Sequence, residues 1–271
     1  MLKVLSWNLN GMGKAQKKWV KDSIVDHKIS FLCLQETKTS ITQEWQINSI
    51  WGGKNPEFLA LDSVGNSSGI VTVWDSNLFE VAKTEKNDGI VVTGIWKEKK
   101  IKLGIINVYA QQGLRSKKAL WESMLRIIRA DLDVAWIVCG DFNEVRSAEE
   151  RKGSVFDPLG ASNFNSFISA AGLTDLMIGG RKFMWMNFNG TKLSKLDRFL
   201  VNDFFVDKWP SANLIALPRL FSDHCPWLMD TGIRDYGPVP FKMFNSWLSD
   251  TDFGQLVRTR WDDRLPEFQV F

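Results

Sequence analysis

The sequence has few of the residues that build disulfide frameworks, zinc sites or membrane spans. Its 271 residues include only three cysteines and two histidines. Cys33, Cys139 and Cys225 each lie in an apolar run, which is typical of reduced thiols in a core. No apolar run approaches the roughly 18 residues of a membrane helix, and the N-terminus lacks the regions of a signal peptide. We therefore expect a soluble intracellular protein with no membrane partner.

The sequence also lacks a strong excess of charge of either sign. It carries 34 basic and 31 acidic residues, for a net charge of +3, which gives only weak support for a nucleic-acid partner. Hydrophobic residues make up 44% and charged residues 24%, and these values exclude wholesale disorder. Tyrosine is scarce at 2 residues, against 13 Trp and 18 Phe, and most of these aromatic rings belong in a core.

Short apolar runs bounded by Gly, Asn, Asp or Ser recur along the chain and predict strands. Some are apolar nearly throughout, which is typical of strands covered on both faces. The predicted strands are Lys3–Trp7, Ser30–Leu34, Glu57–Leu61, Gly69–Trp74, Ile90–Trp96, Lys102–Val108, Ala135–Cys139 and Pro226–Met229.

Apolar residues at helical spacing predict four helices between these strands. Ser116 is the predicted N-cap of the second helix, and Gly172 ends the third. Strands outnumber helices and do not alternate with them strictly, so two β-layers with helices outside fit the order. The predicted helices are Lys14–Asp26, Ser116–Ala130, Ser162–Ala171 and Asp203–Trp209.

One shift in composition divides the chain. The stretch Gly232–Pro240, which reads GIRDYGPVP, has the Pro and Gly content of a linker. We therefore expect a domain over residues 1–231, a linker over 232–240 and a helical C-terminal tail over 241–271.

Polar residues stand at the ends of five apolar runs, where a scaffold of this kind presents a site. Each motif alone has a structural explanation, because Asn-Gly and Gly-Asp are ordinary turn residues. Together they supply carboxylates and amides without a Cys/His cluster, which favours Mg²⁺ or Mn²⁺ over zinc. This set fits metal-assisted phosphodiester hydrolysis. The motifs are SWNLNG, LQETK, NVYA, CGDFNE and FSDHCPW.

The ordered set WNLNG, LQETK, NVYA, GDFN, SKLDR and SDH resembles the endonuclease/exonuclease/phosphatase superfamily, which shares the DNase I fold. GDFNEVRSAEERKG and PFKMFNSWLSD are similar to the apurinic-type endonuclease domain of plant LINE-type non-LTR retrotransposon polyproteins. The resemblance covers residues 1 to about 231. It implies a four-layered α/β sandwich, in which helices flank two packed β-sheets, and a tail that would lead to a reverse transcriptase.

The resemblance also implies a metal site beside the scissile phosphate. Glu36 would be the main ligand of Mg²⁺, with Mn²⁺ as an alternative, and Asn10 would lie near the metal. Asp223 would lie on the leaving-group side and touch a metal. Asn8 would orient the metal-bound groups and the phosphate, and Tyr109 would contact the phosphate.

The same resemblance implies the groups that move protons. Asp141 would activate the attacking water and Asn143 would position it. His224, oriented by Asp197, would stabilise the phosphorane. On this interpretation His224→Ala lowers the cleavage rate and leaves the melting temperature nearly unaltered.

Residues outside these motifs are expected to contact DNA. The resemblance implies that Arg151 and Ser222 bind DNA phosphates. The chain departs from the family at Met184, since relatives often read FTW where this chain reads Phe183-Met184-Trp185. A Thr hydroxyl there would bond a phosphate, so weaker DNA binding is expected.

The predicted function is a divalent-metal-dependent endonuclease that nicks one DNA strand and leaves a 3′-hydroxyl. We expect a monomer in the nucleus. Two alternatives stay open: another phosphodiesterase or phosphatase of the same fold, because fold does not determine function, and a catalytically silent retroelement remnant. The presence of all five main catalytic residues favours competence over decay. These are Glu36, Asp141, Asn143, Asp197 and His224.

Overall fold

The computed structural model describes residues 1–39, 42–52, 56–63, 69–87, 89–176, 182–232 and 252–262. The chain divides into two compact units, Met1–Ile233 and Arg234–Phe271. Except for Gly232, the predicted linker over 232–240 lies outside the described residues. Within the second unit, α7 (Phe253–Asp262) is a helix.

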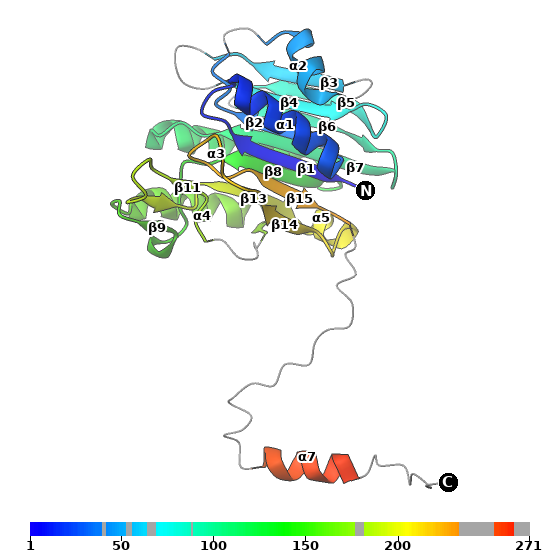
Figure 1. Cartoon of the computed structure of the whole chain (residues 1–271), viewed down its shortest axis with the longest axis vertical. Helices are drawn as coiled ribbons and strands as arrows, with labels where there is room; N and C mark the ends of the chain where they lie inside the picture. The colour runs from blue at the N-terminus through cyan, green and yellow to red at the C-terminus, as the bar shows by residue number, and fades with distance from the viewer. Residues whose placement is uncertain are drawn as a thin grey trace. The chain divides into compact units, whose positions relative to one another are not determined.

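The first unit is built on two six-stranded mixed sheets (Figure 1). The first sheet has the order β14-β15-β1-β2-β4-β3 and the second β10-β13-β8-β7-β6-β5. The strands of the first sheet are β14 (Asn213–Ala216), β15 (Trp227–Asp230), β1 (Lys3–Asn8), β2 (Phe31–Gln35), β4 (Ile70–Asp75) and β3 (Pro56–Leu61). The strands of the second are β10 (Leu173–Asp175), β13 (Asp197–Asn202), β8 (Ala135–Asp141), β7 (Ile101–Tyr109), β6 (Gly89–Trp96) and β5 (Phe79–Lys86).

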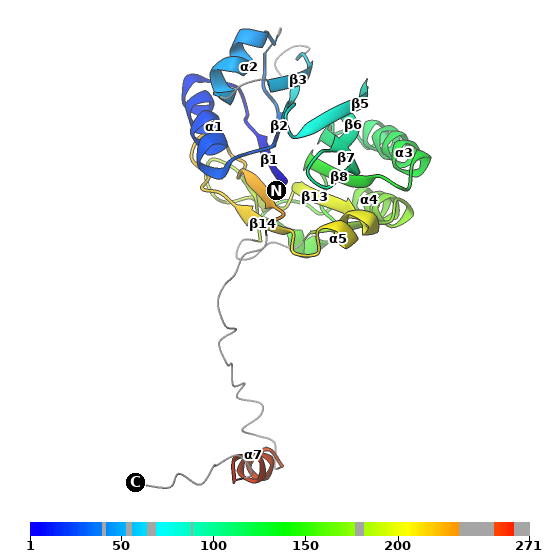
Figure 2. The same ribbon diagram turned by 90° about the vertical axis from the view of Figure 1, so that its right-hand side faces the viewer.

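Helices cover the outer face of each sheet, as the end-on view shows (Figure 2). The helices α1 (Lys14–His27) and α2 (Glu44–Trp51) pack on the first sheet. The helices α3 (Leu114–Ala130) and α4 (Pro158–Ala170) pack on the second. The short α5 (Asp203–Lys208) follows β13. The predicted four-layered α/β sandwich is therefore confirmed.

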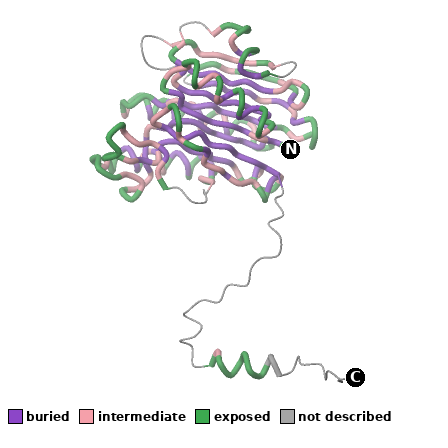
Figure 3. Tube along the Cα trace, in the orientation of Figure 1, coloured by how far each residue is buried: buried purple, intermediate pink, exposed green. Residues whose placement is uncertain are grey.

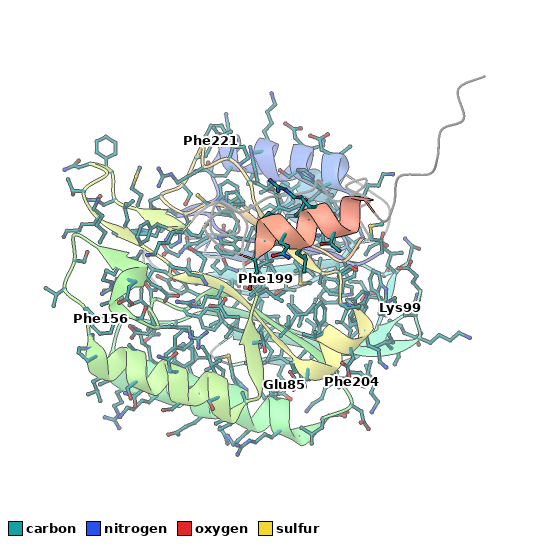
Figure 4. All side chains as sticks on the ribbon, turned by 90° about the horizontal axis from the view of Figure 1, so that it is seen from below. Glu85, Lys99, Phe156, Phe199, Phe204 and Phe221 are labelled. Atoms are coloured by element: carbon teal, nitrogen blue, oxygen red, sulfur yellow. The ribbon has the colours of Figure 1, made fainter. Side chains whose placement is uncertain are left out.

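The alternation of side chains along each strand explains the layers. In β1, Val4 joins the core between the two sheets, while Leu5 and Trp7 join the core under α1 and α2. Both faces of the central strands are covered, so every residue of β8 and all of β1 after Lys3 are buried, while the outward faces of the helices are exposed (Figure 3). In Figure 4 Phe199 of β13 lies inside the sandwich, where it is fully buried.

All eight predicted strands and all four predicted helices occur, with changes at the helix starts. The helix α3 begins at Leu114 with Gly113 as its N-cap, so Ser116 lies within the helix and does not cap it. The helix α4 begins four residues before the predicted start, because Asp157 caps it and Pro158 occupies its first turn. A proline is favourable there, since its missing N–H would have no helical partner.

The sequence patterns missed several elements with weaker signals. The strand β5 is an exposed edge strand with mostly polar residues, and β13 begins with Asp197 and Arg198. A third, small sheet has the order β11-β12-β9 and is formed by β11 (Trp185–Met186), β12 (Leu193–Ser194) and β9 (Arg151–Lys152). A single 3₁₀ turn (Ala148–Glu150) directly precedes β9. Among the described helices, none is long and apolar enough to span a bilayer.

Candidate active site

The polar ends of strands from both sheets meet at one edge of the sandwich. In the first sheet β1 and β2 run parallel with Asn8 beside Gln35, so Glu36 follows directly. In the second sheet Asp141 ends β8 with Tyr109 of β7 on one side and Asp197 of β13 on the other. Sequence motifs separated by more than a hundred residues therefore converge.

A glycine allows Asp141 to reach this edge. Gly140 has φ +134°, a conformation that L residues rarely adopt, and a Cβ there would lie 2.0 Å from the Val108 carbonyl oxygen. Only glycine permits this approach of β8 to β7. The backbone conformation therefore requires glycine at position 140 of the GDFN motif. This conformation places the carboxylate of Asp141 at the site.

Asn8 links the two sheets at the site. Its Nδ2 donates to Glu36 Oε1 at 2.9 Å and to Asp141 Oδ2 at 3.0 Å. Its Oδ1 accepts from the backbone N–H of Asn10 at 3.0 Å. One amide therefore fixes the spacing between a carboxylate of the first sheet and a carboxylate of the second.

His224 is held between two carboxylates. Its Nδ1 lies 2.7 Å from Asp197 Oδ2, and its Nε2 lies 3.8 Å from Asp141 Oδ2. His224 and Asp197 are each only 4% exposed. Burial alone would lower the pKa of His224, but the charge of Asp197, its hydrogen bond and the charge of Asp141 raise it to about 10. The ring is therefore an imidazolium at neutral pH.

The pKa of Asp141 is also raised, but burial is here the main cause of the rise. Burial raises the pKa of its carboxyl to about 6, although the His224 charge and hydrogen bonds from Asn143 and Asn8 oppose the rise. The backbone N–H of Asn143 donates to Asp141 Oδ1 at 2.8 Å, and Asn143 Nδ2 donates to the Ala110 carbonyl at 2.8 Å. A buried carboxylate with a pKa near neutrality is suited to accept a proton.

The outer part of the site is acidic. Asn10 Nδ2 donates to Asp223 Oδ1 at 3.2 Å, and Lys38 Nζ bonds Asn10 Oδ1 and lies 3.6 Å from Glu36 Oε2. Burial, followed by the charge of Glu36 and a hydrogen bond to it, raises the pKa of Tyr109, which stays protonated. Lys38 is the single cation paired with Glu36 among the described residues.

The backbone at these strand ends is unusual. Among the described residues, six non-glycine residues have positive φ. Four of them lie at this site, namely Asn10 (50°), Glu36 (48°), Lys38 (52°) and Asn143 (48°). Such conformations cost energy and concentrate where function requires a set geometry.

Most of the groups described so far line one pocket of about 670 Å³. A second hollow of about 520 Å³ lies between α3 and the strands β5 and β6 and contains none of the predicted site residues. The 670 Å³ pocket brings together most of the predicted set; Asn8 and Asp197 lie buried behind it, and Ser222 lies beside Asn8. The predicted residues that line it are Asn10, Glu36, Tyr109, Asp141, Asn143, Arg151, Asp223 and His224.

The two predicted DNA-binding residues differ in their surroundings. Arg151 lines the pocket from β9, and its guanidinium donates to the Val155 carbonyl at 2.9 Å. Ser222 Oγ donates to the Asn8 carbonyl at 2.8 Å and accepts from the backbone N–H of His224 at 3.1 Å. The Ser222 hydroxyl proton is therefore used to tie the His224 loop to β1.

Met184 lies in the core and not in the pocket. Its side chain is 0% exposed and belongs to the core between the two sheets. Its backbone N–H donates to Ser194 and its carbonyl accepts from Cys225. A side chain at this position faces the core, and the expected weaker DNA binding stays a prediction.

The sequence patterns missed several residues that contact the site. Trp185 Nε1 donates to Asp223 Oδ2 at 2.8 Å, and Lys117 and Lys192 line the pocket. Lys38 stood within the LQETK motif and Trp185 beside Met184, so both could have been identified. Lys117 gave no signal, because it lies on α3 among other basic residues.

Two groups of residues could hold a cation. Asp141, Asp197 and His224 offer ligand atoms within 4.8 Å of one another. However, the two ring nitrogens of His224 already face carboxylates, Asp197 at 2.7 Å and Asp141 at 3.8 Å. The oxygen-rich group of Glu36, Asn10 and Asp223 fits better, because the charges of Glu36 and Asp223 add to burial in raising the pKa of Tyr109, and Lys38 is the single cation paired with Glu36 among the described residues.

Known proteins share this architecture. The profile of the Endonuclease/Exonuclease/phosphatase family matches residues 5–224. No curated protein matches the sequence significantly. Among solved structures, AP endonuclease LMAP from Leishmania major has a TM-score of 0.68 at 19% identity, over 84% of this chain and 86% of that chain.

Two further solved structures have other activities on the same fold. The 3′ phosphatase NExo from Neisseria, bound to a product DNA hairpin, has a TM-score of 0.65 at 15% identity, over 85% of this chain and 99% of that chain. The endonuclease domain of TRAS1, a telomere-specific non-LTR retrotransposon, has a TM-score of 0.59 at 14% identity, over 85% and 98%. At these identities the likeness establishes the fold alone.

Proposed function

The chain belongs to the endonuclease/exonuclease/phosphatase family, and we propose that it is a divalent-metal-dependent endonuclease that nicks one strand of DNA. The observation that carries this proposal is the Asn8 bridge. It sets Glu36 and Asp141 on either side of one amide, with the His224 imidazolium 3.8 Å from Asp141. A carboxylate for a cation, a carboxylate for a proton and a cationic donor are thus within one pocket.

The donor set fits Mg²⁺, with Mn²⁺ as an alternative. Glu36, Asn10 and Asp223 would hold the ion through carboxylate and amide oxygens, which hard cations prefer. When bound, the ion would offset negative charge on the phosphate and on the leaving oxygen. The chain's own cation, Lys38, pairs with Glu36 and Asn10 and would have to yield these oxygens.

The remaining groups account for hydrolysis. Asp141 accepts a proton from water while the water oxygen attacks phosphorus, and Asn143 orients that water. His224 donates a hydrogen bond to a non-bridging oxygen as negative charge grows there, where a fixed donor is most effective. Tyr109, which stays protonated, turns its hydroxyl from Glu36 to donate to the same phosphate. The P–O3′ bond breaks, the departing O3′ takes a proton from solvent water and Asp141 releases its proton to solvent, so the products are a 3′-hydroxyl and a 5′-phosphate.

DNA is the proposed partner. Arg151 and Lys192 bring positive charge to the pocket rim, and phosphate contacts of this kind supply much of the affinity for DNA. The retrotransposon endonuclease among the structural neighbours supports an origin in a retroelement. We also propose that the compact unit acts as a monomer in the nucleus, where DNA lies.

The test is nicking of supercoiled plasmid by purified protein, with Mg²⁺ and with EDTA. We expect nicked circles only with the metal, and 3′ ends that a polymerase extends directly. Glu36→Gln should nearly abolish nicking, while the exposed Glu80→Gln, a matched control on β5, should retain it. Full activity in EDTA or in Glu36→Gln would refute the metal role.

Two other outcomes separate the alternatives. Release of phosphate from 3′-phosphate ends without nicking would favour a phosphatase, the activity named for one structural neighbour. DNA binding with no hydrolysis of any phosphate ester, in either metal, would identify a catalytically silent remnant.

A further inference from the structure

A buried ion pair lies directly behind the catalytic loop. Lys117 of α3 is 7% exposed, and Glu144, which follows Asn143, is 3% exposed. Lys117 Nζ donates to Glu144 Oε2 at 2.9 Å and to the Asn143 carbonyl at 2.6 Å. Both residues line the same pocket as Asp141. The pair therefore contacts the loop that carries two of the proposed catalytic residues.

Glu144 lies against the start of α4 on its other side. Its Oε1 accepts from the backbone N–H of Val145 at 3.1 Å. A Cβ on Gly160, in the first turn of α4, would lie 2.4 Å from Glu144 Oε2. A side chain at position 160 would therefore displace the carboxylate from this helix start, where the helix dipole favours a negative charge. The pair thus joins α3, the catalytic loop and α4.

Asn143 is the residue on which these contacts act. Its backbone is left-handed with φ 48°, a conformation that needs outside support. Three bonds hold it: its N–H donates to Asp141, its Nδ2 donates to Ala110, and its carbonyl accepts from Lys117. Loss of the Lys117 contact would free the carbonyl and with it the Asn143–Glu144 peptide plane, so the left-handed conformation that aims the Asn143 N–H at Asp141 would lose one of its three supports.

We propose that Lys117 and Glu144 are a positioning pair for the reaction, which set the conformation of Asn143 and, through its N–H, the orientation of Asp141. This inference rests on the proposed hydrolytic function. Neither residue has to touch substrate, because the effect passes through the Asn143 carbonyl. The competing explanation is that the pair only joins α3 to α4.

The variants separate these explanations. Lys117→Met alone leaves Glu144 as an unpaired buried charge, which is strongly destabilising. Lys117→Met with Glu144→Gln removes both charges and keeps the shape, so the fold should survive. Lys117→Arg keeps a cation that can reach both acceptors. Lys118→Met, at the neighbouring exposed position of α3, is the matched control.

Two measurements on the full chain test the proposal. In plasmid nicking, the charge-free double variant should lose at least tenfold in kcat with KM changed less than twofold, while Lys117→Arg stays within about threefold of wild type. Hydrogen exchange should be faster at the backbone N–H of Asn143 in the double variant and unchanged at the backbone N–H groups of β8. Lys118→Met should match wild type in both.

The outcomes are distinct. Wild-type kcat and wild-type exchange in the double variant would overturn the proposal and leave a purely structural pair. If the wild-type protein nicks no DNA, the proposed function fails, while the exchange at Asn143 still decides the positioning role. If the double variant does not fold, the Lys117→Arg variant is the test. A tenfold loss of kcat in that variant, with wild-type exchange at the Asn143 N–H, would refute the positioning role of the pair.

Discussion

Replacing His224 by Gln should reduce stability and rate together. Its ring contacts Asp197 at 2.7 Å and faces Asp141 at 3.8 Å, and all three side chains are buried. Without the imidazolium, two buried carboxylates lose their cation. Breaking a buried pair costs about 3–5 kcal/mol. At about 2–4 °C per kcal/mol for a domain of this size, the melting temperature should fall by roughly 6–20 °C.

This expectation differs from the one from sequence alone, which left the melting temperature nearly unaltered in His224→Ala. The reason is burial, since an exposed His–Asp pair would contribute little to stability. The rate per folded molecule should also fall by about a hundredfold or more, because one fixed donor to the transition state is lost. Asp197→Asn should act in the same direction, and the double variant should be less than additive because the two act as a unit.

The assay combines thermal melting by circular dichroism with plasmid nicking at a temperature where every variant is folded. His27→Gln, at the only other histidine, is the matched control and should leave both quantities unaltered. A lowered melting temperature with a normal rate per folded molecule would make His224 structural and refute the mechanism. An unaltered melting temperature would refute the account of the buried charges.

Three further predictions follow from particular residues. The nicking rate should fall as the pH drops below about 6, where Asp141 gains a proton, and as the pH rises through about 10, where His224 loses one. The contribution of His224 to stability should be complete below its unfolded pKa of about 6.5 and should disappear as the pH rises through about 10. Thermal melting measured over this pH range checks the second expectation. A chain cut after Ile233, where the first compact unit ends, should fold and nick DNA like the full chain; an insoluble or inactive product would assign the tail to the domain. Met184→Thr should cost about 2–5 kcal/mol through lost packing and leave the Kd for DNA unchanged, whereas tighter DNA binding would place this side chain at the phosphate.

Local sequence was sufficient for much of the fold and for most of the site. The strands β1, β2 and β8 are apolar on both faces, so their composition marks them without knowledge of their partners. The polar residues that end them, Asn8, Glu36 and Asp141, stand out against these runs. The family resemblance rested on the same residues, and the matched profile over residues 5–224 confirms it.

Other features depended on partners far along the chain. The strand β13 begins with two charged residues, yet Arg198 is fully buried because Glu150 and Asp175 neutralise its guanidinium. No local sequence pattern predicts that these two carboxylates pair with Arg198. The core position of Met184 likewise depends on β12 and on Cys225, which pair with its backbone.

The electrostatic state of the site was also decided by tertiary structure. The sequence placed Asp197 and His224 27 positions apart (224 − 197) and suggested their pairing through family resemblance. It contained no sign of the Lys117–Glu144 pair, whose members are also 27 positions apart (144 − 117) and whose environment depends on a glycine in a third element. Burial and distance set the energies of these charges, and both arise only when the sheets and helices pack.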